Sequence, residues 1–422
     1  MNNFAAFSLA QWLDYLENRH AQEIKLGLDR IRTAAEDLSL LQLENCVVIT
    51  VGGTNGKGST VAALEAIYCS AGYCVGAYTS PHLLQFNERI KINQQCISDQ
   101  ELCSAFQYII GSVHSGNLRY FEAVTLAALW YFKQKRCDVV ILEVGMGGRF
   151  DATNIIDSDL AIITTVDFDH QRYLGTTKDA IGYNKAGILR KEKPFIYADY
   201  DPPHSVTEEA SELINTVFCL GKDYTYAIGD GELSLNLYDK TLFTLPVPNL
   251  NLKAASAAII ASYQLSSVRP VSIDALKEAM HTVSIEGRQQ KLLEDGIITV
   301  YDVAHNCQAA QLLAEKIKDL GSKGKVHAVF AALKDKDICG LISALSACVD
   351  FWYPAILDGK RASNTSQLMD AFNVVMDLEP NCFDSPHAAY ATAKENAEQG
   401  DLIIVYGSFH TVEAVMKITT NA

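Results

Sequence analysis

The sequence is short of basic residues. It has 35 lysines and arginines against 50 aspartates and glutamates in 422 residues, which gives a formal net charge of −15. A field of this sign repels polyphosphate backbones, so we expect no nucleic-acid partner. An anionic substrate must therefore be attracted by a local basic pocket or by a metal ion.

Cysteine pairs and long apolar runs are also missing. The eleven cysteines show no CxxC pair and no zinc-ligand spacing, which is typical of reduced thiols in a cytoplasmic protein. No apolar run reaches the roughly 18 residues that a membrane helix needs. The N-terminal segment lacks the basic and apolar regions of a signal peptide. We therefore expect a cytoplasmic protein that has no membrane partner.

What is present is the composition of a globular protein too long for one ordinary domain, with 49% hydrophobic and 20% charged residues. Apolar residues at helical spacing predict two short helices within 8–41, around a turn near Gly27. Strand-like runs then alternate with helical stretches, which indicates a parallel α/β sheet covered on both faces. The predicted strands are 46–51, 75–79, 138–144 and 160–166, and the predicted helices are 59–71 and 123–134.

The pattern changes twice in the second half of the chain. Short alternating runs within 196–250 predict a small antiparallel patch. Helical spacing returns at 253–264 and 273–281, and a β/α rhythm restarts after a stretch that we interpret as a hinge. The pattern predicts a larger domain over 1–283, a hinge over 284–290, and a smaller α/β domain over 291–422.

A glycine-rich segment, GTNGKGST at 53–60, lies between a predicted strand and a predicted helix. Glycines let backbone N–H groups turn toward phosphate oxygens, and the helix N-terminus adds positive charge. Lys57 would reach the outer phosphates, and Ser59 or Thr60 could offer a hydroxyl to Mg²⁺. Because the spacing departs from the usual GxxxxGK[ST], an ordinary glycine-rich turn is the alternative.

Acidic and histidine side chains follow the neighbouring strands. Glu143 ends one predicted strand, and an acceptor-rich run from Asp167 to His170 follows the next. These are suitable magnesium-site residues at one sheet edge, and Ser80 could add an oxygen ligand. The alternatives are a structural histidine and, for the residues after Glu143, a surface ion pair between Arg149 and Asp151.

Two further segments are weaker signals taken alone. Lys185, between predicted strand elements, is typical of a solvated charge. Asp302 and His305 follow an apolar strand, where the carboxylate could accept from ribose hydroxyls. Arg288 could stabilise transferring phosphoryl charge. The alternative for this segment is a helix cap at Asn306 beside a buried Asp–His pair.

Taken together, these segments resemble the folate branch of the Mur ligase superfamily, dihydrofolate synthase/folylpolyglutamate synthase. The resemblance runs nearly end to end. Its motifs, in order, are the Trp12–Arg30 opening, GTNGKGST (53–60), SPHL to FNERI (80–90), YFExxT (120–125), LEVGMGGRFDATN (142–154), DFDH (167–170), KAGI (185–188), YDVAHN (301–306), KDKDI (334–338) and GSFHTV (407–412).

The resemblance implies that the domain over 1–283 binds ATP and that the domain over 291–422 is Rossmann-like. It also implies a set of roles for the site residues. Lys57, Lys185 and His170 would be catalytic. Lys185 would be carbamylated and hold a second Mg²⁺. The ATP site would comprise Thr54, Asn55, Gly56, Lys57, Gly58, Ser59, Arg288 and Asp302; the first Mg²⁺ would be held by Ser80, Glu143 and His170, directly or through water; and the pterin would lie against Tyr120, Phe121, Glu122, Asp151 and the segment near Ile24–Gly27.

It also implies an activity: ATP-dependent addition of L-glutamate to dihydropteroate through an acyl phosphate, with further glutamates added to reduced folates, by a monomer. Three positions depart from the family pattern, which has glutamate at Asn184, an apolar residue at Gln289 and asparagine at Lys253. Lysine has no acceptor and cannot copy an amide that reads adenine, although Asn249 or Asn251 could substitute. The alternative function is therefore a nucleotide-binding protein on the same fold without ligase activity.

Overall fold

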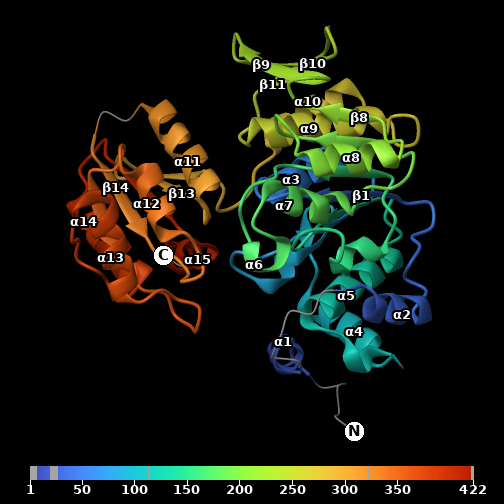
Figure 1. Ribbon diagram of the computed structural model, residues 1–422, viewed down its shortest axis with the longest axis horizontal. Coiled ribbons are helices and arrows are strands. Elements are labelled where there is room, and N and C mark those ends of the chain that lie inside the picture. The colour runs from blue at the N-terminus through green and yellow to red at the C-terminus, as the bar shows by residue number, and fades with distance from the viewer. Residues whose placement is uncertain (1–6, 20–26, 113, 322–323, 420–422) are drawn as a thin grey trace. The chain divides into compact units, whose positions relative to one another are not determined.

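The computed structural model describes residues 7–19, 27–112, 114–321 and 324–419. The chain divides into two compact units, Met1–Ser284 and Ile285–Ala422, and each is built on its own sheet (Figure 1). No helix in the described ranges is long and apolar enough to cross a membrane. All eleven cysteines lie in these ranges as free thiols, and Cys96 and Cys339 are the two that are exposed.

The first unit alternates strands and helices as the sequence predicts. Its elements are α1 (Leu9–Asn18), α2 (Asp29–Asp37), β1 (Val47–Gly52), α3 (Lys57–Ser70), β2 (Val75–Tyr78), η2 (Phe86–Arg89), β3 (Ile90–Ile92), β4 (Gln95–Cys96), α4 (Asp99–Ile110), η3 (Ser115–Asn117), α5 (Tyr120–Lys135), β5 (Val139–Glu143), η4 (Ala152–Ile155), β6 (Leu160–Ile163), α6 (Gln171–Leu174), α7 (Lys178–Ala186), β7 (Phe195–Tyr197), α8 (His204–Glu212), β8 (Val217–Cys219), β9 (Tyr224–Gly229), β10 (Glu232–Leu237), β11 (Lys240–Pro246), α9 (Leu252–Gln264) and α10 (Ile273–Thr282).

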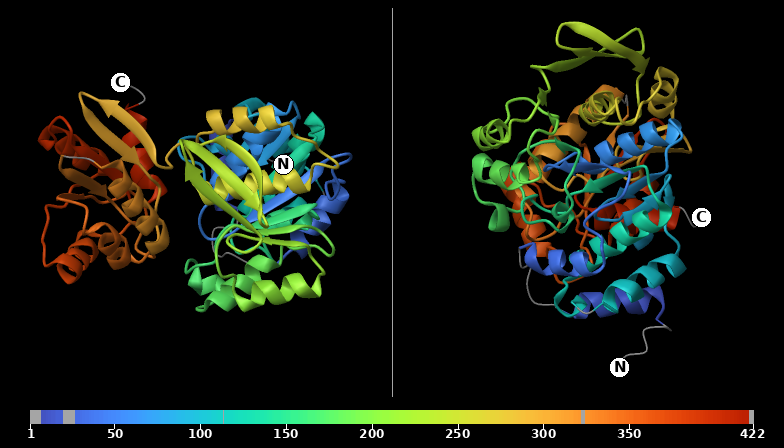
Figure 2. Two further views of the ribbon diagram at one scale, coloured as in Figure 1. Left: turned by 90° about the horizontal axis from the view of Figure 1, so that it is seen from above. Right: turned by 90° about the vertical axis from the view of Figure 1, so that its right-hand side faces the viewer.

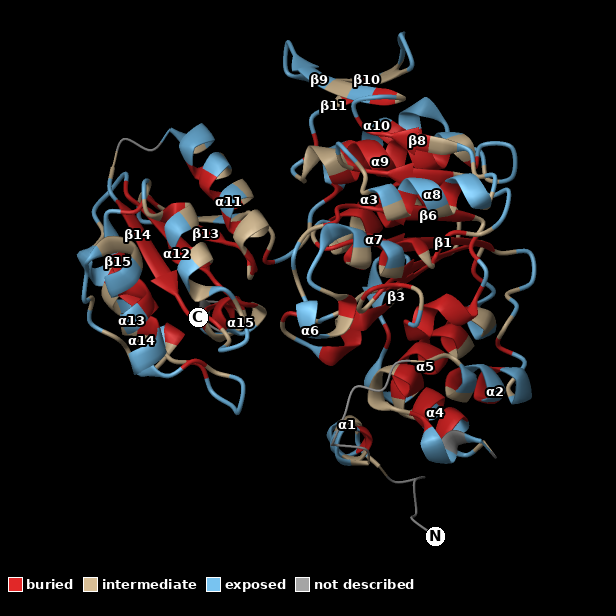
Figure 3. Ribbon diagram, viewed as in Figure 1, coloured by how far each residue is buried: buried red, intermediate tan, exposed pale blue. Residues whose placement is uncertain are grey.

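The main sheet has the order β4-β3-β2-β5-β1-β6-β7-β8. Strands β2 through β8 in this order pair in parallel, and β3 and β4 pair antiparallel at one edge. Strand β1 is central and entirely buried, because α3, α9 and α10 pack on one face of the sheet and α1, α2, α4 and α5 on the other. The buried strands and inward helix faces form the continuous core in Figure 3.

The predicted antiparallel patch is the three-stranded sheet β11-β10-β9, which projects from the unit as a ribbon (Figures 1 and 2). The prediction for 196–250 needs one correction, since β8 and the end of β7 fall within this range and belong to the main sheet. Both strands have only three residues, too few for alternation to distinguish a buried parallel strand from an antiparallel one.

The second unit is a smaller α/β domain. Its elements are β12 (Gln290–Glu294), β13 (Ile297–Tyr301), α11 (Cys307–Leu320), β14 (Val326–Phe330), α12 (Ile338–Leu345), β15 (Phe351–Pro354), α13 (Thr365–Met376), α14 (Pro386–Asn396), β16 (Leu402–Tyr406) and α15 (Phe409–Thr419). The sheet order is β12-β13-β16-β14-β15, with β12 antiparallel and the others parallel. The predicted fold class, a mostly parallel ATPase-type sheet followed by a smaller Rossmann-like domain, is confirmed.

Candidate active site

The glycine-rich segment leaves the carboxyl end of β1 and enters α3. Gly53 and Gly56 have φ values of +141° and +85°, a region that side chains rarely adopt. Gly56 is the N-cap of α3, and no side chain caps the helix there. This is the arrangement in which first-turn N–H groups are presented to an anion, so the segment has the geometry of a phosphate loop.

Hydrogen bonds tie this loop to the segment after β6. Thr54 N–H donates to Thr165 O at 2.9 Å, and its hydroxyl donates to Asp167 O at 3.1 Å. The Thr165 hydroxyl accepts from Asn55 N–H at 3.0 Å. Thr54 and Asn55 therefore stabilise the conformation of the loop. Their contact with a nucleotide stays a prediction.

Hydrogen bonds show which of the two candidate hydroxyls is already engaged and where the loop lysine lies. The Thr60 hydroxyl donates to Gly56 O at 3.0 Å, so it is engaged within its own helix, and Ser59 remains the candidate for Mg²⁺. Lys57 Nζ donates to Gly53 O and Thr54 O at 3.1 and 3.2 Å. The ammonium group thus lies folded over the loop, at the place where phosphate oxygens would replace these carbonyls.

The predicted metal ligands meet at the same sheet edge. Glu143 pairs with Val51 across β5 and β1, and its side chain is buried. Its Oε2 accepts from Ser80 N–H at 3.2 Å, which brings two of the three predicted ligands together. His170, with φ of +50°, caps the short helix α6 after β6, and its side chain is 43% exposed. The role of His170 as a metal ligand stays a prediction.

Lys185 is not the solvated charge between strands that its local sequence indicates. It lies in the last turn of α7 and is only 3% exposed. Burial holds the pKa of its amine well below the ordinary value; Lys57 lowers it further and Asp169 opposes this. A β-carbon built on Gly52, the residue that leads into the phosphate loop, would lie 3.1 Å from Ile188 Cδ1. The chain that follows Lys185 therefore packs beside the start of the loop, which the position of Lys185 in the sequence does not reveal.

The predicted pterin residues form two groups at the start of α5. A β-carbon built on Gly145 would lie 2.6 Å from the Phe121 ring and 3.2 Å from Asp151 Oδ2, so these two side chains converge on that glycine. Tyr120 instead contacts Phe86, with ring centroids 6.4 Å apart. Burial raises the pKa of its hydroxyl.

Asp151 is held by local donors. Its Oδ1 accepts from Thr153 N–H and Oγ1 at 3.0 and 2.7 Å, and its Oδ2 accepts from Met146 N–H at 3.0 Å. Burial raises the pKa of this carboxyl, and these donors oppose the shift. The alternative of a surface ion pair with Arg149 is wrong, because Arg149 pairs with Glu209 at 2.7 Å.

The Glu122 carboxylate also accepts hydrogen bonds from nearby donors. Its Oε1 accepts from Arg30 at 2.9 Å and its Oε2 accepts from Arg119 N–H at 2.8 Å. The carboxylate therefore joins α2 to the first turn of α5. The segment near Ile24–Gly27 lies outside the described residues up to position 26.

In the second unit, Arg288 and Asp302 lie close together. Arg288 stacks on Phe409, 4.9 Å from its ring centroid. Asp302 accepts from Gln289 and Ala304 N–H at 3.1 and 2.8 Å. Burial raises the pKa of Asp302, and Arg288 opposes this. Asn306 does cap α11, accepting from Ala309 N–H, as the alternative for this segment expected.

Two of the three departures from the family pattern, Lys253 and Asn184, make polar contacts in the structure; the Gln289 side chain has no structural explanation. Lys253 Nζ lies 2.6 Å from Asp199 Oδ1 and 5.1 Å from the Tyr200 ring centroid. Asn251 caps α9 through Ala254 N–H, so its side chain is already engaged. Asn184 donates to carbonyl oxygens around α7, and an amide suits that place because a carboxylate has no donor.

Sequence reasoning missed some residues of this region. Arg89 Nε donates to His82 Nδ1 at 2.9 Å beside the ring of Phe86, and the link between Asp169 and Lys185, in which the carboxylate opposes the lowering of the lysine pKa, was not predicted either. Their motifs, DFDH and SPHL to FNERI, were the available signal. The spacing of these residues in the chain does not show which side chains meet.

Comparison with known proteins bears directly on this arrangement. The Mur ligase middle domain family matches residues 51–265, and the Mur ligase, glutamate ligase domain family matches residues 287–409. The dihydrofolate synthase/folylpolyglutamate synthase of Escherichia coli (strain K12) is 39% identical over 98% of this chain and 96% of its own length. The chain belongs to the dihydrofolate synthase/folylpolyglutamate synthase family of Mur ligases.

Other members of this family agree. The Haemophilus influenzae protein of the same name is 38% identical over 98% of both chains. Escherichia coli FolC in complex with DHPP and ADP aligns with a TM-score of 0.93, 39% identity and 99% coverage of both chains. A bifunctional folylpolyglutamate synthase/dihydrofolate synthase with Mn, AMPPNP and L-glutamate bound aligns with a TM-score of 0.91, 39% identity and 99% coverage of both chains. Membership makes this protein an enzyme of the ligase class, as predicted.

Proposed function

We propose that this ligase adds L-glutamate to dihydropteroate, and further glutamates to reduced folates, at the expense of ATP. The observation that carries the proposal is the phosphate loop at the start of α3 beside the buried carboxylate of Glu143. The relatives named above carry both activities in their names. The ligands of two related structures, DHPP with ADP and AMPPNP with Mn and L-glutamate, match the substrates that we assign.

We assign ATP to the phosphate loop, with Lys57 and the first turn of α3 facing the outer phosphates. Glu143 and Ser80 fit a hard divalent metal, because Mg²⁺ is usually held by one or two carboxylates together with phosphates and water. Within the described ranges no cluster of three or more histidine, cysteine, aspartate or glutamate residues could hold a metal. We therefore propose that phosphate oxygens of ATP supply some of the ligands of the metal. When bound, the metal would neutralise phosphate charge. His170 would contact the metal directly or through water.

Lys185 is suited to carbamylation, in which its neutral amine attacks carbon dioxide, forms a C–N bond and releases one proton. Burial favours this neutral form because it lowers the pKa of the amine. The carbamate would then supply oxygen ligands for a second divalent metal. The positive charge of Lys57 nearby would stabilise the new negative charge.

The reaction itself needs no nucleophile from the protein. The substrate carboxylate attacks the γ-phosphorus to form an acyl phosphate and ADP, and the amine of L-glutamate then displaces phosphate from the acyl carbon. Catalysis rests on positioning and charge stabilisation. We place the pterin against Tyr120, Phe121 and Asp151. Glu122 would hold the start of α5 in place through its hydrogen bond with Arg30 and so fix the shape of this site.

The second unit completes the proposal. We assign Arg288 and Asp302 to ATP and residues 284–290 to a hinge. We further propose that the protein acts as a monomer in the cytoplasm, where its eleven free thiols would stay reduced.

The test is phosphate release by the purified protein with Mg²⁺-ATP and L-glutamate, with and without dihydropteroate. Release that requires both acceptor and amine is expected. Repeating the assay with tetrahydrofolate tests the second activity. Lys57→Ala should abolish release, while Lys222→Ala, at an exposed lysine of the same unit, should not. ATP binding without substrate-dependent release would instead favour the nucleotide-binding alternative.

A further inference from the structure

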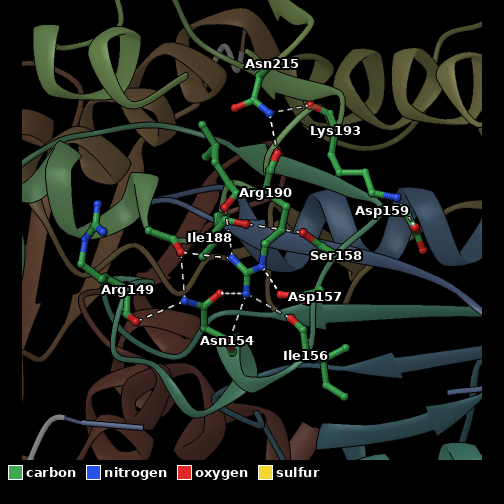
Figure 4. A network of polar contacts seen from close by, with 12 residues as sticks. Arg149, Asn154, Ile156, Asp157, Ser158, Asp159, Ile188, Arg190, Lys193 and Asn215 are labelled. Carbon is green, nitrogen blue, oxygen red and sulfur yellow. Dashed lines mark hydrogen bonds and ion pairs between the residues drawn. The ribbon is translucent and has the colours of Figure 1, made fainter. Parts of the chain in front are cut away.

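Arg190 and Asn154 form a network of hydrogen bonds that no motif above explains (Figure 4). Arg190 Nη1 donates to the carbonyl oxygens of Gly187 and Leu189 at 3.3 and 3.1 Å. Its Nη2 donates to Asn154 O and Oδ1 at 3.1 and 2.9 Å and to Ile156 O at 3.3 Å. One guanidinium group thus collects acceptors from two separate stretches of chain.

Asn154 makes the reverse connection. Its Nδ2 donates to Arg149 O at 3.1 Å and to Gly187 O at 2.9 Å. We call these two side chains and the carbonyls that they bind the Asn154–Arg190 clamp. Its partners fall in residues 149–156, which follow the strand of Glu143, and in residues 187–189, which follow the helix of Lys185.

The two stretches approach each other closely. Arg149 N–H donates to Asn184 O at 2.7 Å. A β-carbon built on Gly148 would lie 2.9 Å from Lys185 O, and one on Gly187 would lie 2.4 Å from Arg149 Cα. The backbone that carries Lys185 therefore lies directly against the loop that leads to Asp151.

No sheet ladder fixes this contact, since the chain here is turn, 3₁₀ helix and helix end. The last carbonyls of α7 accept from N–H groups that follow the helix, whereas the clamp binds the next carbonyls, Gly187 O and Leu189 O. Arginine offers five N–H donors in a rigid fork, whereas lysine offers three donors at a single point. An arginine is therefore suited to set the distance between these two stretches. Its side chain is 21% exposed and also pairs with Asp157.

We propose that Asn154 and Arg190 are positioning residues that hold Lys185 beside the phosphate loop. They act by fixing the last turn of α7 against the loop after β5. The catalytic consequence of this proposal rests on the proposed function, in which Lys185 serves the ligation. The positional consequence does not.

The first arm of the test measures the position of Lys185 in the full-length protein. An acylating amine reagent is added well below the melting temperature, and mass spectrometry gives the labelling rate of Lys185 relative to the exposed Lys222. In the wild type Lys185, which is 3% exposed, should be protected. In Arg190→Lys its relative rate should rise about fivefold or more, the effect of roughly 1 kcal/mol of local opening.

The second arm measures kcat and KM per folded enzyme at the same temperature. Arg190→Lys should lower kcat by about tenfold to a hundredfold, the effect of a misplacement of about 1 Å, and leave the KM for ATP within about twofold. Lys193→Met is the matched control, because Lys193 pairs with Asp159 at 2.9 Å and joins neighbouring parts of the same two segments at the surface. It should change neither labelling nor kcat.

Asn154→Asp provides a second variant should Arg190→Lys fold poorly, since it keeps the shape and loses both donors of Asn154. Faster labelling of Lys185 together with lower kcat supports the proposal. Unchanged labelling, or faster labelling with wild-type kcat, overturns it. If the wild type shows no ligation at all, the proposed function fails, and the labelling arm alone still decides whether the clamp holds Lys185.

Discussion

Replacing Gly53 by alanine tests the shape of the phosphate loop. Gly53 has φ of +141°, and a β-carbon there would lie 1.8 Å from Thr164 Oγ1. That hydroxyl donates to Asn55 O at 2.6 Å and contacts Gly52 O at 3.2 Å, so it would have to rotate away from both. Backbone strain of about 1–3 kcal/mol and a lost hydrogen bond of about 0.5–1.5 kcal/mol predict a destabilisation of about 1.5–4.5 kcal/mol.

A double-mutant cycle with Thr164→Ala separates the two contributions. Thr164→Ala removes the hydroxyl, so Gly53→Ala should then cost less, about 1–3 kcal/mol of backbone strain, together with the tight contacts at 3.0 Å to the β-carbon and N of residue 164 that remain. Urea unfolding followed by the fluorescence of Trp12 and Trp130, both in the first unit, gives the free energies. ADP titration shows whether the loop still binds. The prediction is wrong if the losses of unfolding free energy in the two single variants simply add in the double variant. It is also wrong if the Gly53→Ala protein is as stable as the wild type.

Three further predictions concern separate parts of the first unit. Burial raises the pKa of Glu65, so wild-type stability falls as pH rises through that pKa. Glu65→Gln should therefore melt higher than wild type at pH 8, with the difference shrinking toward pH 5 in thermal scans; a constant difference would contradict this. Arg30→Met and Glu122→Gln should each lower the free energy of unfolding by about 1–3 kcal/mol. The double variant should lower it by hardly more than either single variant, because both substitutions break the same partly buried ion pair. Lys253→Asn should change the Kd for ADP by up to about tenfold, the effect of one hydrogen bond, and leave pyrophosphate binding unchanged in calorimetry.

The sequence predicts much of the fold and the phosphate side of the site, because both depend on local patterns. The apolar run before Gly52 specifies a central buried strand, and the glycines at 53 and 56 specify the turn. Glu143 could be predicted because it ends an apolar strand, and parallel strands bring such ends together.

Long-range packing explains what could not be predicted. Lys185 is buried in a helix that Gly147 and Gly148 allow another loop to approach closely, and its own local sequence does not indicate this packing. Glu122 is paired with Arg30, 92 residues away, and no local pattern indicates that pair. Strands of three residues, such as β8, carry too little periodicity to be assigned to a sheet.

The distribution of thiols has a practical consequence. Cys96, in β4 of the first unit, and Cys339, in α12 of the second, are the two cysteines that are exposed. Each unit thus has one exposed native thiol to which a fluorescent dye can be attached, besides the cysteines that are only partly exposed. Donor and acceptor dyes on these two thiols would report the separation of the units during turnover by energy transfer.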